Sequence, residues 1–154
     1  MHQTDRIERY WAEFLRQTGR DASLRYATCF YFGFNEALAG ELLQLVLEGK
    51  KRATCSSVRA FELEGDPLPK PGDMSVITNY AGEPRCIIQT TRVTVMPFRE
   101  VTFDLAVREG EDENLESWRQ GHIRAFTHDA KTLGFEFSED MPVVFEDFTV
   151  VYPL

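Results

Sequence analysis

The 154-residue sequence is poor in histidine and cysteine, and it lacks the motifs of several common enzyme classes. With three histidines and no HExxH pair, a histidine-rich metal centre is not expected, and nothing suggests a cofactor. A P-loop needs the pattern GxxxxGK followed by Ser or Thr, and a dinucleotide fingerprint needs three spaced glycines after a strand. Neither pattern occurs, which argues against the usual metal-dependent and nucleotide-dependent enzymes.

The three cysteines, Cys29, Cys55 and Cys86, are odd in number, lie far apart and form no CxxC pair. This pattern argues against both a disulfide framework and a structural zinc site. We expect buried or half-buried thiols in a reducing cytosol. Catalysis by Cys55 is the alternative, although only the neighbouring lysines would lower the pKa of its thiol.

The sequence also lacks a long apolar run and an excess of positive charge. No segment approaches the roughly 20 apolar residues of a membrane-spanning helix, and the charged start of the chain does not resemble a signal peptide. We therefore expect a cytoplasmic protein with no membrane partner. The net charge of −8 argues against a surface that binds duplex DNA. Residues 49–99 nevertheless carry eight basic and five acidic side chains, a net +3. This local positive charge is typical of a site for a small anionic or single-stranded ligand. The alternative is a solvated strand surface on which basic residues cluster by chance.

Apolar residues make up 43% of the chain, including 12 phenylalanines, which is enough for one hydrophobic core. Their spacing predicts three main helices, at residues 5–19, 35–49 and 115–134. A capping box of Asp5 and Glu8 is expected to begin the first helix. Gly19, Gly49 and Gly134 are expected to end the three helices.

Extended segments are predicted between and after these helices. They are residues 53–58, 74–79, 85–95 and 142–151, with a hairpin turn at 80–83 and further extended structure at 98–101. Helices outside and several antiparallel strands inside predict an α+β fold. No repeat or composition break divides the chain, so we expect one domain over residues 1–154, with an N-terminal helical extension at about 1–30.

The most informative segment follows the second predicted helix and reads Gly49-Lys50-Lys51-Arg52-Ala53-Thr54-Cys55-Ser56. Cations at this point compensate the negative end of the helix dipole. Lys51 and Thr54 are three residues apart where the chain enters a strand, so an amine and a hydroxyl can converge. Lys51 can act as a base for Thr54 only if its pKa is lowered. A charged Lys51 would instead hold a phosphate or a carbonyl oxygen, and spacing alone favours this second role.

The pattern Gly49-x-Lys51-x-x-Thr54-x-Ser56 resembles the GxKxxTxR signature of the ASCH family, whose fold is similar to the PUA domains of RNA-modifying enzymes. Further matches to the longer bacterial branch of that family extend over nearly the whole chain. They are Phe32-Gly33, Lys70-Pro-Gly-Asp73, Phe98-Arg-Glu-Val101, Leu115-x-x-Trp118-x-x-x-His122-x-x-x-Phe126 and Asp140-Met-Pro-Val-Val144. The resemblance implies a small mixed β-barrel flanked by the three main helices, with a cleft that binds RNA or a small nucleoside.

The resemblance also implies a chemistry. One branch of the family removes the acyl group of N4-acetylcytidine with a lysine and a threonine of this motif and a later glutamate. Lys51, Thr54 and Glu113 match these three, with Glu111 and Asp112 as alternatives for the carboxylate. Lys51 would be the base, Thr54 the nucleophile, and Glu113 would orient the lysine or protonate the leaving amine. Two other functions stay open, a non-catalytic single-stranded RNA-binding module and a metal-independent ribonuclease.

The sequence departs from the family pattern at Ser56, where an arginine is usual. The change removes a bidentate partner for phosphate or carboxylate, which favours binding over catalysis. Seven candidate ligand-binding residues lie in the motif or on later elements. They are Lys50, Arg52, Ser56, Arg59, Tyr80, Trp118 and His122. Tyr80 at a hairpin tip is free to stack on a base, whereas Trp118 and His122 occur at helical spacing with core residues, so packing is the favoured role for both.

Overall fold

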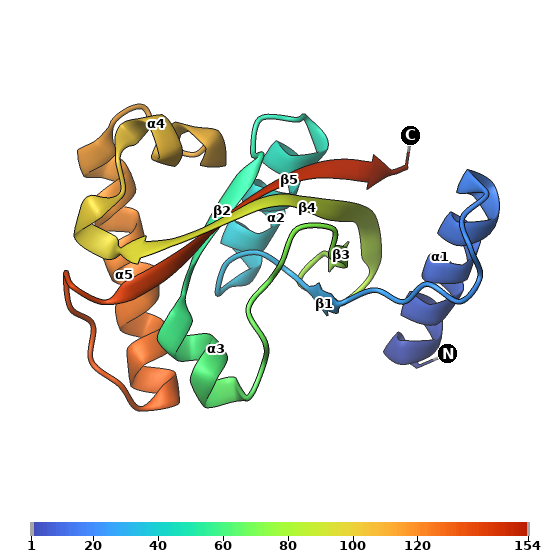
Figure 1. Ribbon diagram of the computed structural model, residues 1–154, viewed down its shortest axis with the longest axis horizontal. Coiled ribbons are helices and arrows are strands. Elements are labelled where there is room, and N and C mark those ends of the chain that lie inside the picture. Colours follow the sequence, from blue (N-terminus) through green and yellow to red (C-terminus); the bar gives the residue numbers. More distant parts are fainter. Residues whose placement is uncertain (1, 154) are drawn as a thin grey trace.

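The computed structural model describes residues 2–153, in which helices pack around a curled five-stranded sheet (Figure 1). The strands are β1 (Thr28–Phe30), β2 (Ala53–Ser57), β3 (Met74–Thr78), β4 (Pro84–Pro97) and β5 (Pro142–Tyr152). The α-helices are α1 (Gln3–Thr18), α2 (Glu36–Leu47), α3 (Val58–Glu64), α4 (Phe103–Ala106) and α5 (Leu115–Leu133), with 3₁₀ turns at Phe98–Glu100 and Val107–Glu109. The α+β prediction is confirmed, and the sheet forms the half-barrel of the expected small barrel.

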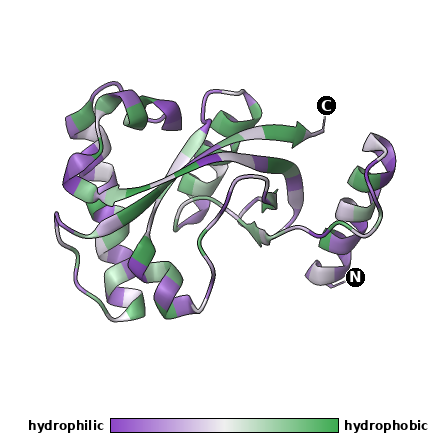
Figure 2. Cartoon of the chain, in the orientation of Figure 1, coloured by the Kyte–Doolittle hydropathy of each residue, from purple (hydrophilic) through white to green (hydrophobic). Residues whose placement is uncertain are grey.

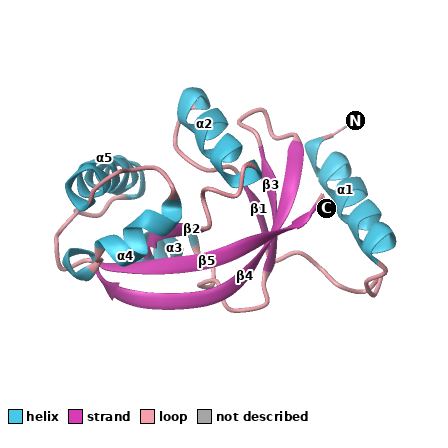
Figure 3. Cartoon of the chain, turned by 90° about the horizontal axis from the view of Figure 1, so that it is seen from above, coloured by secondary structure: helices cyan, strands magenta, loops and turns pink. Residues whose placement is uncertain are grey.

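The strand order in the sheet is β1-β3-β4-β5-β2, and only β1 and β3 run parallel. The long strands β4 and β5 form the central ladder, which is visible from above in Figure 3. The edge strand β2 pairs antiparallel with β5, so that Thr54 lies opposite Glu146. This pairing brings the motif of residues 49–56 against the C-terminal strand.

The ends of the predicted helices are largely as expected. The Asn35 side chain accepts a hydrogen bond from the amide of Leu38 at 2.8 Å and so begins α2, and Gly49 follows that helix with φ of +77°. The predicted capping box of α1 is wrong, because the helix begins before Asp5 and has no side-chain cap. Asp5 instead lies inside the first turn, where its negative charge favours the positive end of the helix dipole.

The short helices α3 and α4 and both 3₁₀ turns were not predicted. The predicted strand at residues 53–58 ends one residue early, because the Ser57 hydroxyl accepts a hydrogen bond from the amide of Ala60 at 3.2 Å and begins α3. The expected extended segment at 98–101 is wrong, since residues 98–100 form a 3₁₀ turn. A helix of one or two turns is too short to show the periodicity by which longer helices are recognised.

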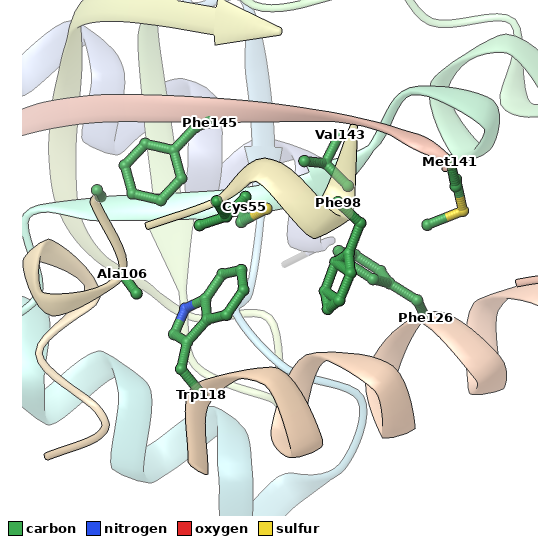
Figure 4. Packing of buried hydrophobic residues seen from close by; sticks show 10 residues of the cluster. Cys55, Phe98, Ala106, Trp118, Phe126, Met141, Val143 and Phe145 are labelled. Carbon is green, nitrogen blue, oxygen red and sulfur yellow. The ribbon is translucent and has the colours of Figure 1, made fainter. Parts of the chain in front are cut away.

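The apolar residues form three clusters, each between one helix and the sheet. In Figure 2 the helices contain both hydrophobic and hydrophilic residues, as expected of helices with one apolar side. The cluster under α5 contains Trp118, Phe126, Phe98 and Phe145 (Figure 4), the cluster under α1 contains Trp11 and Phe14, and the cluster under α2 contains Val46 and Phe148. Within residues 2–153 no helix is long and apolar enough to cross a membrane.

Candidate functional site around Lys51

Lys51 is a buried cation, with only 1% of its side chain exposed. Its backbone amide donates to the carbonyl of Leu45 in α2, which fixes the chain where the helix ends. The Nζ atom donates to the carbonyl of Ala53 at 2.9 Å, to Glu109 Oε1 at 3.0 Å and to Glu111 Oε2 at 2.8 Å. These three hydrogen bonds use all three N–H groups of the ammonium.

Glu109 is also buried, and it connects Lys51 to α5. Its second oxygen, Oε2, accepts a hydrogen bond from Trp118 Nε1 at 2.5 Å and lies 3.0 Å from His122 Nε2. The other ring nitrogen of His122 lies 3.0 Å from the carbonyl oxygen of Trp118. Both ring nitrogens of His122 thus face oxygen acceptors, an arrangement that favours the doubly protonated imidazolium. We call Lys51, Glu109, Glu111, Trp118 and His122 the buried network.

The charged groups of the buried network shift one another's pKa values. Burial opposes the charged forms of Lys51 and His122, but the adjacent carboxylates outweigh it, so both groups have a raised pKa. Burial also opposes ionisation of Glu109, yet the two cations keep its pKa well below the usual range. The pKa of Glu111 is raised, mainly by burial and against the attraction of Lys51. Two cations therefore balance two carboxylates in a buried space, as buried charges require.

Gly110 allows the two glutamates to approach Lys51 from the same turn. Its φ is +70°, and a Cβ atom there would lie 2.2 Å from the carbonyl oxygen of Lys50. The amide of Arg52 donates to the carbonyl of Arg108 at 2.8 Å, which ties this turn to the start of β2. Any other residue at position 110 would push the turn away from the lysine.

Thr54 lies on the other face of β2 from the buried residues Ala53 and Cys55, since side chains alternate along a strand. No buried side-chain nitrogen or oxygen of the described residues lacks a hydrogen-bond partner. Within residues 2–153 the hydroxyl of the half-buried Thr54 makes no side-chain hydrogen bond, so it reaches solvent. Its cross-strand neighbour on β5 is Glu146, which accepts a hydrogen bond from the Thr90 hydroxyl at 2.5 Å. Burial raises the pKa of Glu146.

The structure does not bring the predicted carboxylate to Lys51. Glu113 is exposed and is not among the hydrogen-bond partners of Lys51. Residues 112–114 instead begin α5: Asn114 accepts from the amide of Ser117 at 2.8 Å, and Asp112 accepts from its hydroxyl at 2.6 Å. Glu111, the alternative, does bond Lys51. Glu109 was missed, although the pattern of two acids around a glycine was a signal for two carboxylates on one tight turn.

The predicted base role of Lys51 does not fit this geometry. An amine with a raised pKa that already donates three hydrogen bonds has no lone pair to accept a proton. No hydrogen bond joins Lys51 to Thr54. The lysine belongs to the buried network, whereas the threonine lies on the half-buried face of β2. Cys55 is buried and its pKa is raised, first by burial, which does not favour a thiolate nucleophile.

The other candidate ligand-binding residues fall into buried and exposed groups. Trp118 is fully buried, with its ring stacked between Phe98 and His122, so none of its surface is free for a base. Ser56 shares the face of Thr54 on β2. Tyr80 is 45% exposed, and its ring contacts that of Tyr31 edge to face at 5.1 Å between centroids.

The positive segment predicted at residues 49–99 is largely neutralised by ion pairs. The basic side chains of this segment that pair with carboxylates are Lys50, Lys51, Arg59, Lys70, Arg85, Arg92 and Arg99. Arg52 is exposed, and within the described chain it has no ion-pair partner. Among the same residues, no group of three or more His, Cys, Asp or Glu side chains is arranged to hold a metal ion.

Comparisons with known proteins identify the family of this chain. The sequence profile of the ASCH domain matches residues 28–152. The crystal structure of an ASCH domain from Lactobacillus crispatus JV V101 superposes with a TM-score of 0.87 at 35% identity, covering 97% of this chain and 96% of that one. A protein from Enterococcus faecalis V583 gives a TM-score of 0.87 at 32% identity, covering 96% and 89%. No curated protein matches the chain. The chain belongs to the ASCH domain family, whose members generally have an RNA-binding, PUA-like fold.

Proposed function

We propose that this ASCH domain binds single-stranded RNA or a nucleoside, with a base stacked on Tyr80 and Tyr31. The observation that carries the proposal is the exposure of these two touching rings, at 45% for Tyr80 and 40% for Tyr31. Exposed aromatic rings are the usual platform for unpaired bases, and each stacked base contributes roughly 1–3 kcal/mol. The general RNA binding of the family supports the same conclusion.

The buried network limits which cations can bind phosphate. Lys51 is buried and its charge is balanced by Glu109 and Glu111, so it does not contact phosphate in this proposal. Arg52, the next residue, is exposed and forms no ion pair with any other residue of 2–153. Because few phosphate contacts can form here, we expect binding with a modest salt dependence.

Fluorescence anisotropy with a short labelled single-stranded RNA tests this proposal. Tyr80→Ala is expected to weaken binding at least fivefold, the effect of losing about 1 kcal/mol of stacking. Tyr80→Phe is the matched control, because it keeps the ring and should keep the affinity. Equal affinities for wild type and Tyr80→Ala would contradict a stacking role.

A second candidate function is hydrolysis of the N4-acyl group of a modified cytidine, with Thr54 as the nucleophile. It is favoured by the free hydroxyl of Thr54 and by the position of Glu146 directly opposite on β5. In an antiparallel pair, opposite Cβ atoms lie about 4.5–5.5 Å apart, which lets a carboxylate reach a neighbouring hydroxyl. We therefore assign the base to Glu146 in place of Lys51.

The chemical steps follow from that assignment. Thr54 Oγ1 forms a bond to the acyl carbon while its proton passes to Glu146. The bond from the acyl carbon to N4 then breaks, and the amine leaves with the proton from Glu146. Water cleaves the resulting threonine ester, which releases the carboxylic acid and restores the hydroxyl.

Release of cytidine from N4-acetylcytidine measures this activity. Thr54→Val and Glu146→Gln should each abolish turnover, whereas Ser56→Ala, on the same face, should retain it. The rate should rise with pH as Glu146 loses its proton, and this rise should lie above the ordinary range of a glutamate because burial raises the pKa of Glu146. Undiminished turnover by Thr54→Val would refute the mechanism.

A further inference from the structure

A surface cavity of about 390 Å³ lies between α1 and the start of β4, away from the buried network. In Figures 1 and 3, α1 lies beside the end of the sheet that contains β3 and the curved part of β4. The charged and aromatic side chains that line the cavity are Arg6, Arg9, Arg85, Tyr10, Glu13 and Glu83. Three arginines therefore surround one hollow in a protein whose net charge is −8.

Two of these arginines are free to bind a ligand. Arg6 and Arg9 are exposed and lie one turn apart on α1, so they share one side of the helix. Within residues 2–153, neither forms an ion pair or a side-chain hydrogen bond. Arg85 pairs with Glu83 at 3.3 Å, and Glu83 also accepts a hydrogen bond from Asn79 at 2.9 Å. The other carboxylate of the lining, Glu13, accepts a hydrogen bond from Gln17 at 2.8 Å, and Arg6 is among the positive charges that lower the pKa of Glu83. Three arginines thus face two carboxylates, which leaves the lining with one excess positive charge.

The cavity and the tyrosine pair belong to the same hairpin. Glu83 begins the cavity wall only three residues after Tyr80, a separation of at most about 11 Å between Cα atoms. The turn is fixed by the amide of Asn79, which donates to the carbonyl of Glu83 at 3.0 Å. Gly82 in this turn lies against the side chain of Gln3, the first residue of α1. A stacking surface and a cationic hollow therefore lie near one another at one short turn.

We propose that the arginine cavity binds a phosphodiester group of the same single-stranded RNA whose base stacks on Tyr80 and Tyr31. The guanidinium groups of Arg6 and Arg9 match phosphate oxygens in charge and in the geometry of their paired N–H donors. A groove with cations along the backbone and aromatic rings for the bases is the usual design of single-strand binding surfaces. This inference rests on the proposed RNA binding. It adds α1, which precedes the residues matched by the ASCH profile, to the binding surface.

The test compares two double variants of the full chain by fluorescence anisotropy with a labelled single-stranded RNA. Arg6→Ala/Arg9→Ala removes the cavity's free cations, and Arg16→Ala/Arg124→Ala removes two exposed arginines that do not line it. The first variant should bind at least tenfold more weakly. The slope of log affinity on log salt concentration should fall by about 0.7 for each phosphate that the variant no longer neutralises. The control should stay within about threefold of wild type, because it loses only non-specific attraction.

The outcomes separate this inference from the proposed function. If Tyr80→Ala weakens binding but Arg6→Ala/Arg9→Ala leaves affinity and salt slope unchanged, the cavity does not bind RNA and the proposed function stands. If wild type does not bind single-stranded RNA at all, this inference falls together with the RNA-binding part of the proposed function. Inorganic phosphate is the second probe: if the double variant loses binding of inorganic phosphate but keeps RNA affinity, the cavity takes a free anion and the RNA assignment is overturned. Melting curves verify that both double variants are folded.

Discussion

Replacing Lys51 with methionine tests whether the buried network stabilises the fold. Methionine fills a similar volume but leaves Glu109 Oε1 and Glu111 Oε2 without their shared ammonium donor. Breaking a buried ion pair by removing one partner typically costs 3–5 kcal/mol, because a charge stays buried without compensation. We expect Lys51→Met to lower the free energy of unfolding by about 3–5 kcal/mol. For a chain of this size that corresponds to a melting temperature roughly 6–20 °C lower.

Urea unfolding followed by tryptophan fluorescence measures this loss, since Trp118 lies within the buried network. Lys50→Met is the matched control: the neighbouring lysine is 65% exposed and pairs only with Glu48, so stability should barely change. A drop below about 1 kcal/mol for Lys51→Met, at an unchanged denaturant slope, would refute the argument. It would mean that methionine packing compensates for the missing ammonium, as happens when whole buried ion pairs are replaced.

The pH dependence gives a second measure of the same variant. Without the ammonium, the pKa values of Glu109 and Glu111 in the folded state must rise, because nearby positive charge favours ionisation and has been removed. A carboxyl whose folded pKa lies above its unfolded value stabilises the fold at low pH, and this contribution is lost as the pH rises. The destabilisation of Lys51→Met should therefore be smaller near pH 5 than near pH 8.

Three further predictions concern the residues around this network and the thiols. The pKa of His122 is raised in the folded state, so its contribution to stability is complete at a pH below the unfolded-state pKa of about 6.5 and is lost as the pH rises through the folded-state pKa. His122→Gln should abolish this pH dependence of stability, measured by urea titrations at several pH values. Gly110→Ala should lower the melting temperature more than Gly134→Ala, because both have positive φ but only the first places a Cβ 2.2 Å from the Lys50 carbonyl oxygen. Native protein should react with a thiol reagent first at half-buried Cys29, and the two buried thiols should react only on unfolding; equal rates at all three would contradict the burial.

The sequence predicted those elements whose signals are local. Asn35 and Gly49 were identified as the ends of α2 because a capping side chain and a left-handed glycine act within one turn of the chain. The turn at 80–83 was likewise evident from its residues. The capping box at Asp5 failed because a pair of suitable residues does not decide between two adjacent starting points for a helix.

The candidate site was predicted only in part. Lys51 was among the predicted site residues, but the sequence did not indicate that its ammonium would be enclosed by Glu109 and Glu111, residues 58 and 60 positions away along the chain. Glu113 resembled the expected carboxylate by its position, whereas its neighbours are occupied in beginning α5. No sequence pattern indicated Glu146, because it lies far from Thr54 along the chain and no local motif relates the two residues.

The amino-acid sequence therefore indicated the three main helices, the four strands β2 to β5 and the motif that begins at Gly49. Periodicity and capping depend on residues a few positions apart, so the chain carries that information locally. The raised pKa of Lys51 and the position of Glu146 opposite Thr54 came from the folded arrangement alone. A pKa depends on burial and on charges brought near by folding, and the register of β2 against β5 is set by pairing between distant segments.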